Sequence, residues 1–211
     1  MIASPLWVYG VGFAAQLIFA ARMFVQWAQS EKAGKSVSPA IFWQLSILGA
    51  LIFLFYGILR DDFAIVLGQV LVYFIYVRNL HLKDQWRSIP LVFRIFVIIA
   101  PVIALVYLFI DVSGNVISVF SNKSISTPLQ IWGSVGQVIF TLRFFVQWID
   151  SETKNESVLT QRFWIVSFVG SFMILTYAVL RYDPVLLLGQ LSGLAIYIRN
   201  FMLGKSKRSR I

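Results

Sequence analysis

The stretch RMFVQWAQSE, from Arg22 to Glu31, returns 121 residues further along the chain as RFFVQWIDSE, from Arg143 to Glu152. Around it, the chain aligns with itself at this offset without a gap from Gly12 to Leu82. The matching positions include many polar residues, which hydrophobic composition alone does not produce. The chain therefore contains an internal repeat, and each copy holds three long apolar segments.

The composition is that of a membrane protein. The chain has 211 residues, of which 59% are hydrophobic and 13% charged, and its mean hydropathy is +0.80. Soluble domains are about 45–50% apolar and about 25% charged. Its apolar segments are about 20 residues long, enough to span a bilayer as helices, and they lack the ten-residue alternation of a membrane β-barrel. We predict an all-α integral membrane protein.

Seven transmembrane helices are predicted, and they cover Leu6–Trp27, Ala40–Leu59, Phe63–Leu80, Leu91–Ile110, Leu129–Ile149, Phe163–Leu180 and Val185–Leu203. The turns RDDF and RYDP, which begin at Arg60 and Arg181, predict tight hairpins. The fourth helix lies outside the repeat and restores the second three-helix copy to the orientation of the first. This predicts a 3+1+3 layout of parallel repeats, with a substrate cavity between them.

The predicted domains follow this layout: a first repeat over residues 1–82, a linker with the fourth helix over 83–127, a second repeat over 128–203, and a basic tail over 204–211. With the N-terminus outside, 13 of the 18 lysines and arginines fall on the inner side and three outside. By the positive-inside rule this predicts a multi-pass inner-membrane protein with a cytoplasmic C-terminus. The segment MIASPLWVYG has no basic residue, which argues against a cleaved signal peptide.

The unit from Phe24 to Leu80, with VQW, GQ and Y-x-RN as its most specific parts, resembles the lipid A biosynthesis N-terminal domain, a membrane module also found at the front of some lipid-A-disaccharide synthases. That domain is similar to the PQ-loop group of SWEETs and SemiSWEETs, so the resemblance implies a SWEET-like fold. Gln26 and Gln147 match the glutamine of the Pro-Gln motif. Val25 and Val146 replace its proline, so a proline-hinged movement is not implied.

Two interpretations of the buried arginines stay open. In the first, Arg22 and Arg143 converge and hold an anionic group, for which a guanidinium fork is suited. In the second, both extend to the inner headgroups while the glutamines form interhelical hydrogen bonds. The candidate substrate-binding residues are Arg22, Arg143, Gln16, Gln137, Gln26, Gln147, Gln69, Gln190, Tyr56 and Tyr177.

Two further duplicated sets have a structural alternative. The outer set can gate a site or staple the hairpins, and it contains Arg60, Asp62, Arg181 and Asp183. The inner set can contact lipid headgroups or cap helix carbonyls, and it contains Arg78, Asn79, Arg199 and Asn200.

The sequence shows no catalytic set and no metal-ligand spacing, and it has no cysteine and a single histidine, His81. We therefore expect no enzyme, no metal and no cofactor. The net charge of +9 is expected to face membrane lipids, with no nucleic-acid partner.

The predicted function is a transporter or flippase for a lipid-linked or anionic glycoconjugate, such as a polyprenyl-phosphate sugar or a lipid A precursor. Two alternatives remain open. One is a non-transporting membrane module that scaffolds a cytoplasmic glycosyltransferase partner. The other is a SWEET-like uniporter of free sugars.

Overall fold

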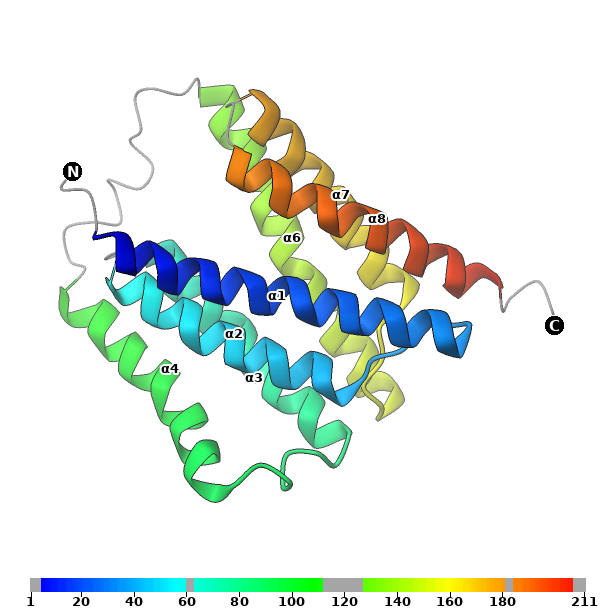
Figure 1. The fold of residues 1–211 in the computed structure, drawn as a ribbon, viewed down its shortest axis with the longest axis horizontal. Helices are drawn as coiled ribbons and strands as arrows, with labels where there is room; N and C mark the ends of the chain where they lie inside the picture. Colours follow the sequence, from blue (N-terminus) through cyan, green and yellow to red (C-terminus); the bar gives the residue numbers. More distant parts are fainter. Residues whose placement is uncertain (1–4, 60–62, 112–126, 181–183, 207–211) are drawn as a thin grey trace. The chain divides into compact units, whose positions relative to one another are not determined.

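The computed structural model describes residues 5–59, 63–111, 127–180 and 184–206. All regular structure in these ranges is helical (Figure 1), which confirms the all-α prediction. The helices are α1 (Leu6–Ala33), α2 (Ala40–Leu59), α3 (Phe63–Leu82), α4 (Leu91–Asp111), α6 (Thr127–Lys154), α7 (Gln161–Leu180) and α8 (Pro184–Ser206). Each begins at or within two residues of a predicted span.

Membrane helices are also supported. Within the described ranges, α1, α2 and α7 are long and apolar enough to cross a membrane. The helix α4 exposes Leu91, Val92 and Phe93 at its start, with Val92 76% exposed. Such a run of large apolar side chains is suited to lipid rather than water. Seven spans and a SWEET-like arrangement remain predictions.

The helices α1 and α6 extend beyond the predicted spans, which end at Trp27 and Ile149. In both, an indole donates to a carboxylate one turn later: the Nε1–Oε1 distance is 2.9 Å from Trp27 to Glu31 and from Trp148 to Glu152. Such pairs support a helix after its apolar part has ended. Hydropathy therefore marked the part suited to lipid and not the end of the helix.

Both long helices end in the same way. Gly34 follows α1 with a φ of 60°, and Asn155 follows α6 with a φ of 49°. Glycine and asparagine are the residues that tolerate this left-handed conformation. The chain then closes back on the helix, because the amide of Lys35 donates to the carbonyl of Ser30 at 3.3 Å and that of Glu156 to Ser151 at 3.1 Å.

The chain forms two compact units. Unit 1 contains Met1–Arg22 and Ala40–Asn122, and unit 2 contains Met23–Pro39 and Lys123–Ile211. The helix α1 is therefore shared, since its residues up to Arg22 belong to unit 1 and those from Met23 to unit 2. This division follows packing, whereas the predicted domains follow the sequence repeat.

The two units contain the same aromatic packing. In unit 1, the ring of Trp43 lies 4.8 Å from Phe42 and 6.0 Å from Tyr76. In unit 2, Trp164 lies at the same distances from Phe163 and Tyr197. Unit 1 has a further apolar cluster that joins α2, α3 and α4, and it contains Leu54, Val66 and Ala104 with Ile58 and Val70.

Candidate functional site

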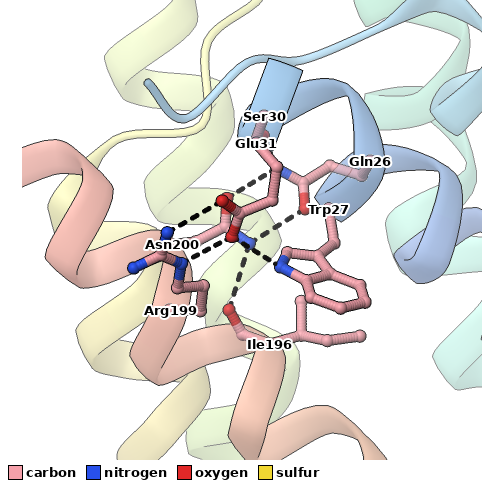
Figure 2. Close-up of polar contacts among 7 residues, drawn as sticks. All are labelled: Gln26, Trp27, Ser30, Glu31, Ile196, Arg199 and Asn200. Carbon is pink, nitrogen blue, oxygen red and sulfur yellow. Dashed lines mark hydrogen bonds and ion pairs between the residues drawn. The ribbon is translucent and has the colours of Figure 1, made fainter. Parts of the chain in front are cut away.

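In unit 2, the end of α1 is fastened to α8 by a buried polar group, which we call the glutamine cluster. Figure 2 shows Gln26, Ser30, Asn200 and the carbonyl of Ile196, and the carbonyl of Val37 completes the cluster. The Nε2 of Gln26 donates to the Oδ1 of Asn200 at 2.9 Å, and the Nδ2 of Asn200 donates back to the Oε1 of Gln26 at 3.1 Å. Both side chains are fully buried. The pair therefore satisfies polar groups that would otherwise be costly to bury.

The same glutamine also closes the loop after α1. Its Nε2 donates to the hydroxyl of Ser30 at 2.8 Å and to the carbonyl of Val37 at 3.1 Å. The amide of Val37 donates to the same hydroxyl at 3.1 Å. Gln26 thus fixes the path of the chain from α1 towards α2.

A charged contact between α8 and α1 lies beside the glutamine cluster, at the residues next to Ser30 and Asn200. The guanidinium of Arg199 donates through Nε and Nη2 to the two carboxylate oxygens of Glu31, at 2.5 and 2.8 Å, and Trp27 donates to the same carboxylate (Figure 2). The contact is bidentate, the geometry that guanidinium and carboxylate favour.

The second copy of the motif builds the same loop. The Nε2 of Gln147 donates to Ser151 at 2.7 Å and to the carbonyl of Val158 at 3.1 Å. The amide of Val158 donates to Ser151 at 3.1 Å. The matching bonds of Gln26 differ by no more than 0.1 Å, so the repeated QW, SE and SV letters encode a loop structure.

Three hydroxyl contacts fasten the loop of the first repeat to the loop of the second repeat and to α7, all within unit 2. The hydroxyl of Ser36 donates to the carbonyl of Leu159 at 3.2 Å and accepts from the indole of Trp164 at 2.9 Å. The hydroxyls of Ser38 and Ser157 lie 2.9 Å apart. The end of α1 and its loop are therefore an integral part of unit 2.

In unit 1, Arg22 points between the helices. Only 6% of it is exposed, and its Nη1 donates to the hydroxyl of Ser46 at 2.8 Å and to that of Tyr76 at 3.4 Å. Its guanidinium carbon lies 4.5 Å from the ring centre of Phe19 and 5.4 Å from that of Phe42. Hydroxyls and ring faces orient the guanidinium.

In unit 2, Arg143 is 7% exposed. Its Nη1 donates to the carbonyl of Phe140 at 2.6 Å, and its guanidinium lies over the rings of Phe140 and Phe144. Both arginines therefore lie among aromatic rings, buried between helices, and neither extends towards an exposed surface. Their predicted role in substrate binding stays a prediction.

The other four predicted glutamines have three kinds of environment. Gln16 and Gln137 are exposed, so they do not share the buried setting of Arg22 and Arg143. Gln190 is partly buried and accepts a hydrogen bond from Ser171 at 2.7 Å. Gln69, its counterpart in the first repeat, has a buried Oε1 with no hydrogen-bond partner in the described part of the chain.

The predicted tyrosines pack against glycines. A Cβ added at Gly12 would lie 2.9 Å from the ring of Tyr56, and one added at Gly133 would lie 2.6 Å from the ring of Tyr177. Each tyrosine ring occupies the space that a side chain at the glycine would need. The two glycines therefore permit the neighbouring helices to pack closely. Whether the tyrosines also meet a substrate stays a prediction.

The predicted outer set lies outside the described residues, as do both hairpin turns; it comprises Arg60, Asp62, Arg181 and Asp183. In the inner set, Asn79 and Asn200 are fully buried, and each donates to the carbonyl four residues earlier, at 2.8 and 3.0 Å. Arg78 and Arg199 are exposed. Their contact with headgroups stays a prediction.

Several residues of these contacts were not among the predicted site residues: Ser30, Ser151, Ser46 and Tyr76. The signal was present, because all four lie at matched positions of the repeat. A repeat shows that a position matters in both copies, but it does not show which atoms meet there.

A family model for the Lipid A Biosynthesis N-terminal domain matches residues 11–81 and 132–202 of this chain. The chain belongs to this family. The two matches confirm both the resemblance and the tandem arrangement of its copies. No solved structure matches the chain.

Three proteins that are similar to this chain are each named lipid-A-disaccharide synthase. The one from Chlamydia felis (strain Fe/C-56) is 30% identical over 97% of this chain, and the one from Chlamydia trachomatis serovar D (strain ATCC VR-885 / DSM 19411 / UW-3/Cx) is 31% identical over 97%. That from Chlamydia muridarum (strain MoPn / Nigg) is 32% identical over 82%. The alignments cover 34%, 35% and 30% of these relatives, so the chain spans about a third of their length.

These names correct one prediction. We expected no enzyme from the lack of a catalytic set, yet the relatives bear an enzyme's name. The expectation was wrong because the absence of a recognisable motif within one module says nothing about the proteins in which that module occurs. Both comparisons associate the chain with lipid A biosynthesis.

Proposed function

We propose that this protein is a membrane transporter or flippase that moves a lipid-linked, anionic glycoconjugate. It is a multi-pass inner-membrane protein with seven spans in a 3+1+3 layout, the N-terminus outside and the C-terminus in the cytoplasm. The observation that carries the proposal is a guanidinium buried at the same place in both repeats, at Arg22 and Arg143.

Burial of an arginine in a membrane helix is costly, by about 3 kcal/mol on insertion scales. The aromatic rings and hydroxyls around Arg22 reduce that cost and hold the guanidinium in one direction. An arginine retains its charge in such surroundings and presents a planar fork of donors to a phosphate. Both repeats retain a buried arginine despite this energetic cost, which supports a role in binding an anionic group.

The family and the names of the relatives support the substrate class. The synthesis of lipid A involves phosphorylated and glycosylated lipids. A lipid A precursor or a polyprenyl-phosphate sugar carries an anionic group for the arginines and an acyl or prenyl chain for the membrane. We assign this class to the chain, with membrane lipids as its surroundings.

A second function is favoured by the length of the relatives. This chain corresponds to about a third of each lipid-A-disaccharide synthase, so in those proteins the matched region is joined to a much larger remainder. By this second proposal, the chain is a membrane module that recruits a glycosyltransferase and presents a lipid to it. The glutamine cluster and the Arg199–Glu31 contact would then stiffen the surface that the partner meets.

The test is translocation in liposomes that contain the purified protein and a labelled polyprenyl-phosphate sugar. Replacement of both arginines, Arg22→Gln with Arg143→Gln, should lower the rate at least about tenfold, because each removes a charge-assisted contact worth about 1.5–3 kcal/mol. The matched control is Arg162→Gln: this arginine is exposed, and its Nη1 lies 3.5 Å from Asp150.

A double variant that keeps its helical circular dichroism and transports at the normal rate would refute the role of the arginines. Movement of free glucose without the lipid would favour a sugar uniporter. If nothing moves, but a lipid-A-disaccharide synthase binds the protein and loses activity without it, the recruitment function replaces transport.

A further inference from the structure

The two repeats differ on one face of their third helices, and the difference lies in buried polar atoms. On α3, the Oε1 of Gln69 and the hydroxyl of Tyr73 are buried, and neither has a hydrogen-bond partner in the described part of the chain. Tyr73 is only 3% exposed. At about 100° per residue, the two side chains lie about 40° apart on the helix, one turn from each other.

In the second repeat, the corresponding glutamine has a hydrogen-bond partner. Gln190, the counterpart of Gln69, accepts from the hydroxyl of Ser171 at 2.7 Å. In the first repeat the position of Ser171 is held by Ala50, which is fully buried and offers no donor. The position of Tyr73 is held in the second repeat by Leu194. Only the first repeat therefore combines a glutamine and a tyrosine that both require a partner.

A buried polar atom without a partner costs about 1–3 kcal/mol. Two of them, one turn apart, indicate a site that an external group completes. Since Gln69 offers an acceptor through Oε1 and Tyr73 can donate or accept, the complementary group is one that both donates and accepts, namely an alcohol or a sugar hydroxyl.

Charged groups fit less well. A phosphate dianion has no hydrogen to give to the Oε1 of Gln69. A cation would lie near Arg22, whose guanidinium contacts Tyr76, the next residue of this face. The distance along α3 from Gln69 to Tyr76 is about 10 Å at 1.5 Å per residue, which is about the length of a sugar joined to a phosphate.

We infer that Gln69 and Tyr73 form a site for the sugar hydroxyls of the substrate, with its phosphate at Arg22. This deepens the proposed function and rests on it, because it divides one substrate between two subsites of unit 1. Both orphan atoms are buried, so binding of the substrate requires α3 to move relative to the helices that pack against it. The second repeat, with Ser171 and Leu194, has no such sugar site.

The test compares two labelled lipids in phosphatidylcholine nanodiscs: a polyprenyl-phosphate glucose and the same polyprenyl phosphate without its sugar. The protein should bind the first about tenfold more tightly, since two neutral hydrogen bonds separate them. Tyr73→Phe and Ala50→Ser should each reduce this preference to about threefold, because each removes one of the two hydrogen bonds. Ala50→Ser does so by giving Gln69 the internal partner that Gln190 already has.

Stability separates this effect from misfolding. Without lipid, Ala50→Ser should raise the unfolding temperature, because it gives the Oε1 of Gln69 a donor. Tyr73→Phe should leave it unchanged or raise it, because it removes the orphan hydroxyl. Tyr9→Phe, also in unit 1, is the control for loss of a tyrosine hydroxyl and should keep the preference.

The outcomes distinguish the two proposals. Equal binding of both lipids by the unaltered protein, or an undiminished preference in Ala50→Ser, would refute the sugar site and leave the phosphate site standing. A higher unfolding temperature for Ala50→Ser with no effect on lipid binding would mean that ordered water alone completes the site. If Arg22→Gln leaves the binding of both lipids unchanged, the proposed function itself fails.

Discussion

At the scale of the residue, the side chain that matters most for structure is the glutamine of the repeated motif. The Nε2 of Gln26 lies within hydrogen-bond distance of three acceptors, and its Oε1 accepts from Asn200, with both amides fully buried. A side chain with this many buried partners is tied to one position. Its role in fixing a loop and two helices does not require any contact with a substrate.

Replacement of Gln26 by leucine should destabilise the protein by at least about 2 kcal/mol, because it leaves the amide of Asn200 buried without its partner. The free energy of unfolding can be measured by urea titration in detergent micelles. Asn200→Leu should cost a similar amount, and the double variant should cost less than the sum, with a coupling energy of about 1–3 kcal/mol.

The control is Gln16→Leu, which removes an exposed glutamine from the same helix and should change stability by no more than about 0.5 kcal/mol. Additive effects of the two cluster variants would mean that the Gln26–Asn200 pair does not contribute as one unit.

At the scale of the element, the repeat allows the end of α1 to be compared with the end of α6, where a different residue adopts the same backbone conformation. Gly34 has a φ of 60°, and no heavy atom lies within 4 Å of a Cβ added there. Gly34→Ala should therefore cost about 1 kcal/mol through backbone strain alone. Gly34→Asn should cost less, because Asn155 already adopts a φ of 49° at the same place. Thermal unfolding of the two variants checks the order, and equal losses would contradict it.

Close packing between α6 and α7 makes a second prediction. Gly133→Ala would place a Cβ 2.6 Å from the ring of Tyr177, so it should destabilise the protein by about 1–3 kcal/mol. Gly10→Ala meets nothing within 4 Å and should be neutral or stabilising, since alanine favours a helix. Chemical denaturation measures both, and a neutral Gly133→Ala would show that the ring moves aside without cost.

The helices could be predicted from the sequence because each has an apolar segment with clear ends. Hydropathy could not predict that α1 and α6 continue to Ala33 and Lys154, because there polar side chains such as Glu31 and Glu152 support the helix. The duplicated arginines could be found, but not their direction, since the hydroxyls of Ser46 and Tyr76 that Arg22 contacts lie on other helices, far along the chain. A comparison that relies on identical residues in the two repeats does not reveal the position at which they differ, Ala50 in the first and Ser171 in the second.

At the scale of the whole molecule, the proposed orientation follows from charge. The chain has no cysteine, so single cysteines report cleanly. We expect Trp7→Cys, at the start of α1, to react with an impermeant maleimide in intact cells from which the outer membrane has been removed. Lys35→Cys, exposed in the loop after α1, should react only after the inner membrane is opened. The reverse pattern would overturn the orientation.

The glutamine cluster also bears on how such a chain can arise. Gln26 belongs to the first copy of the repeat and Asn200 to the second, yet they form one reciprocal pair. An ancestor with a single copy would hold a glutamine and an asparagine on different helices and could complete the pair only with a second chain. Duplication within one gene would place both copies in a single chain, after which the two copies were free to diverge. The divergence between Ala50 and Ser171 is the kind of specialisation that a symmetric dimer of identical chains could never acquire.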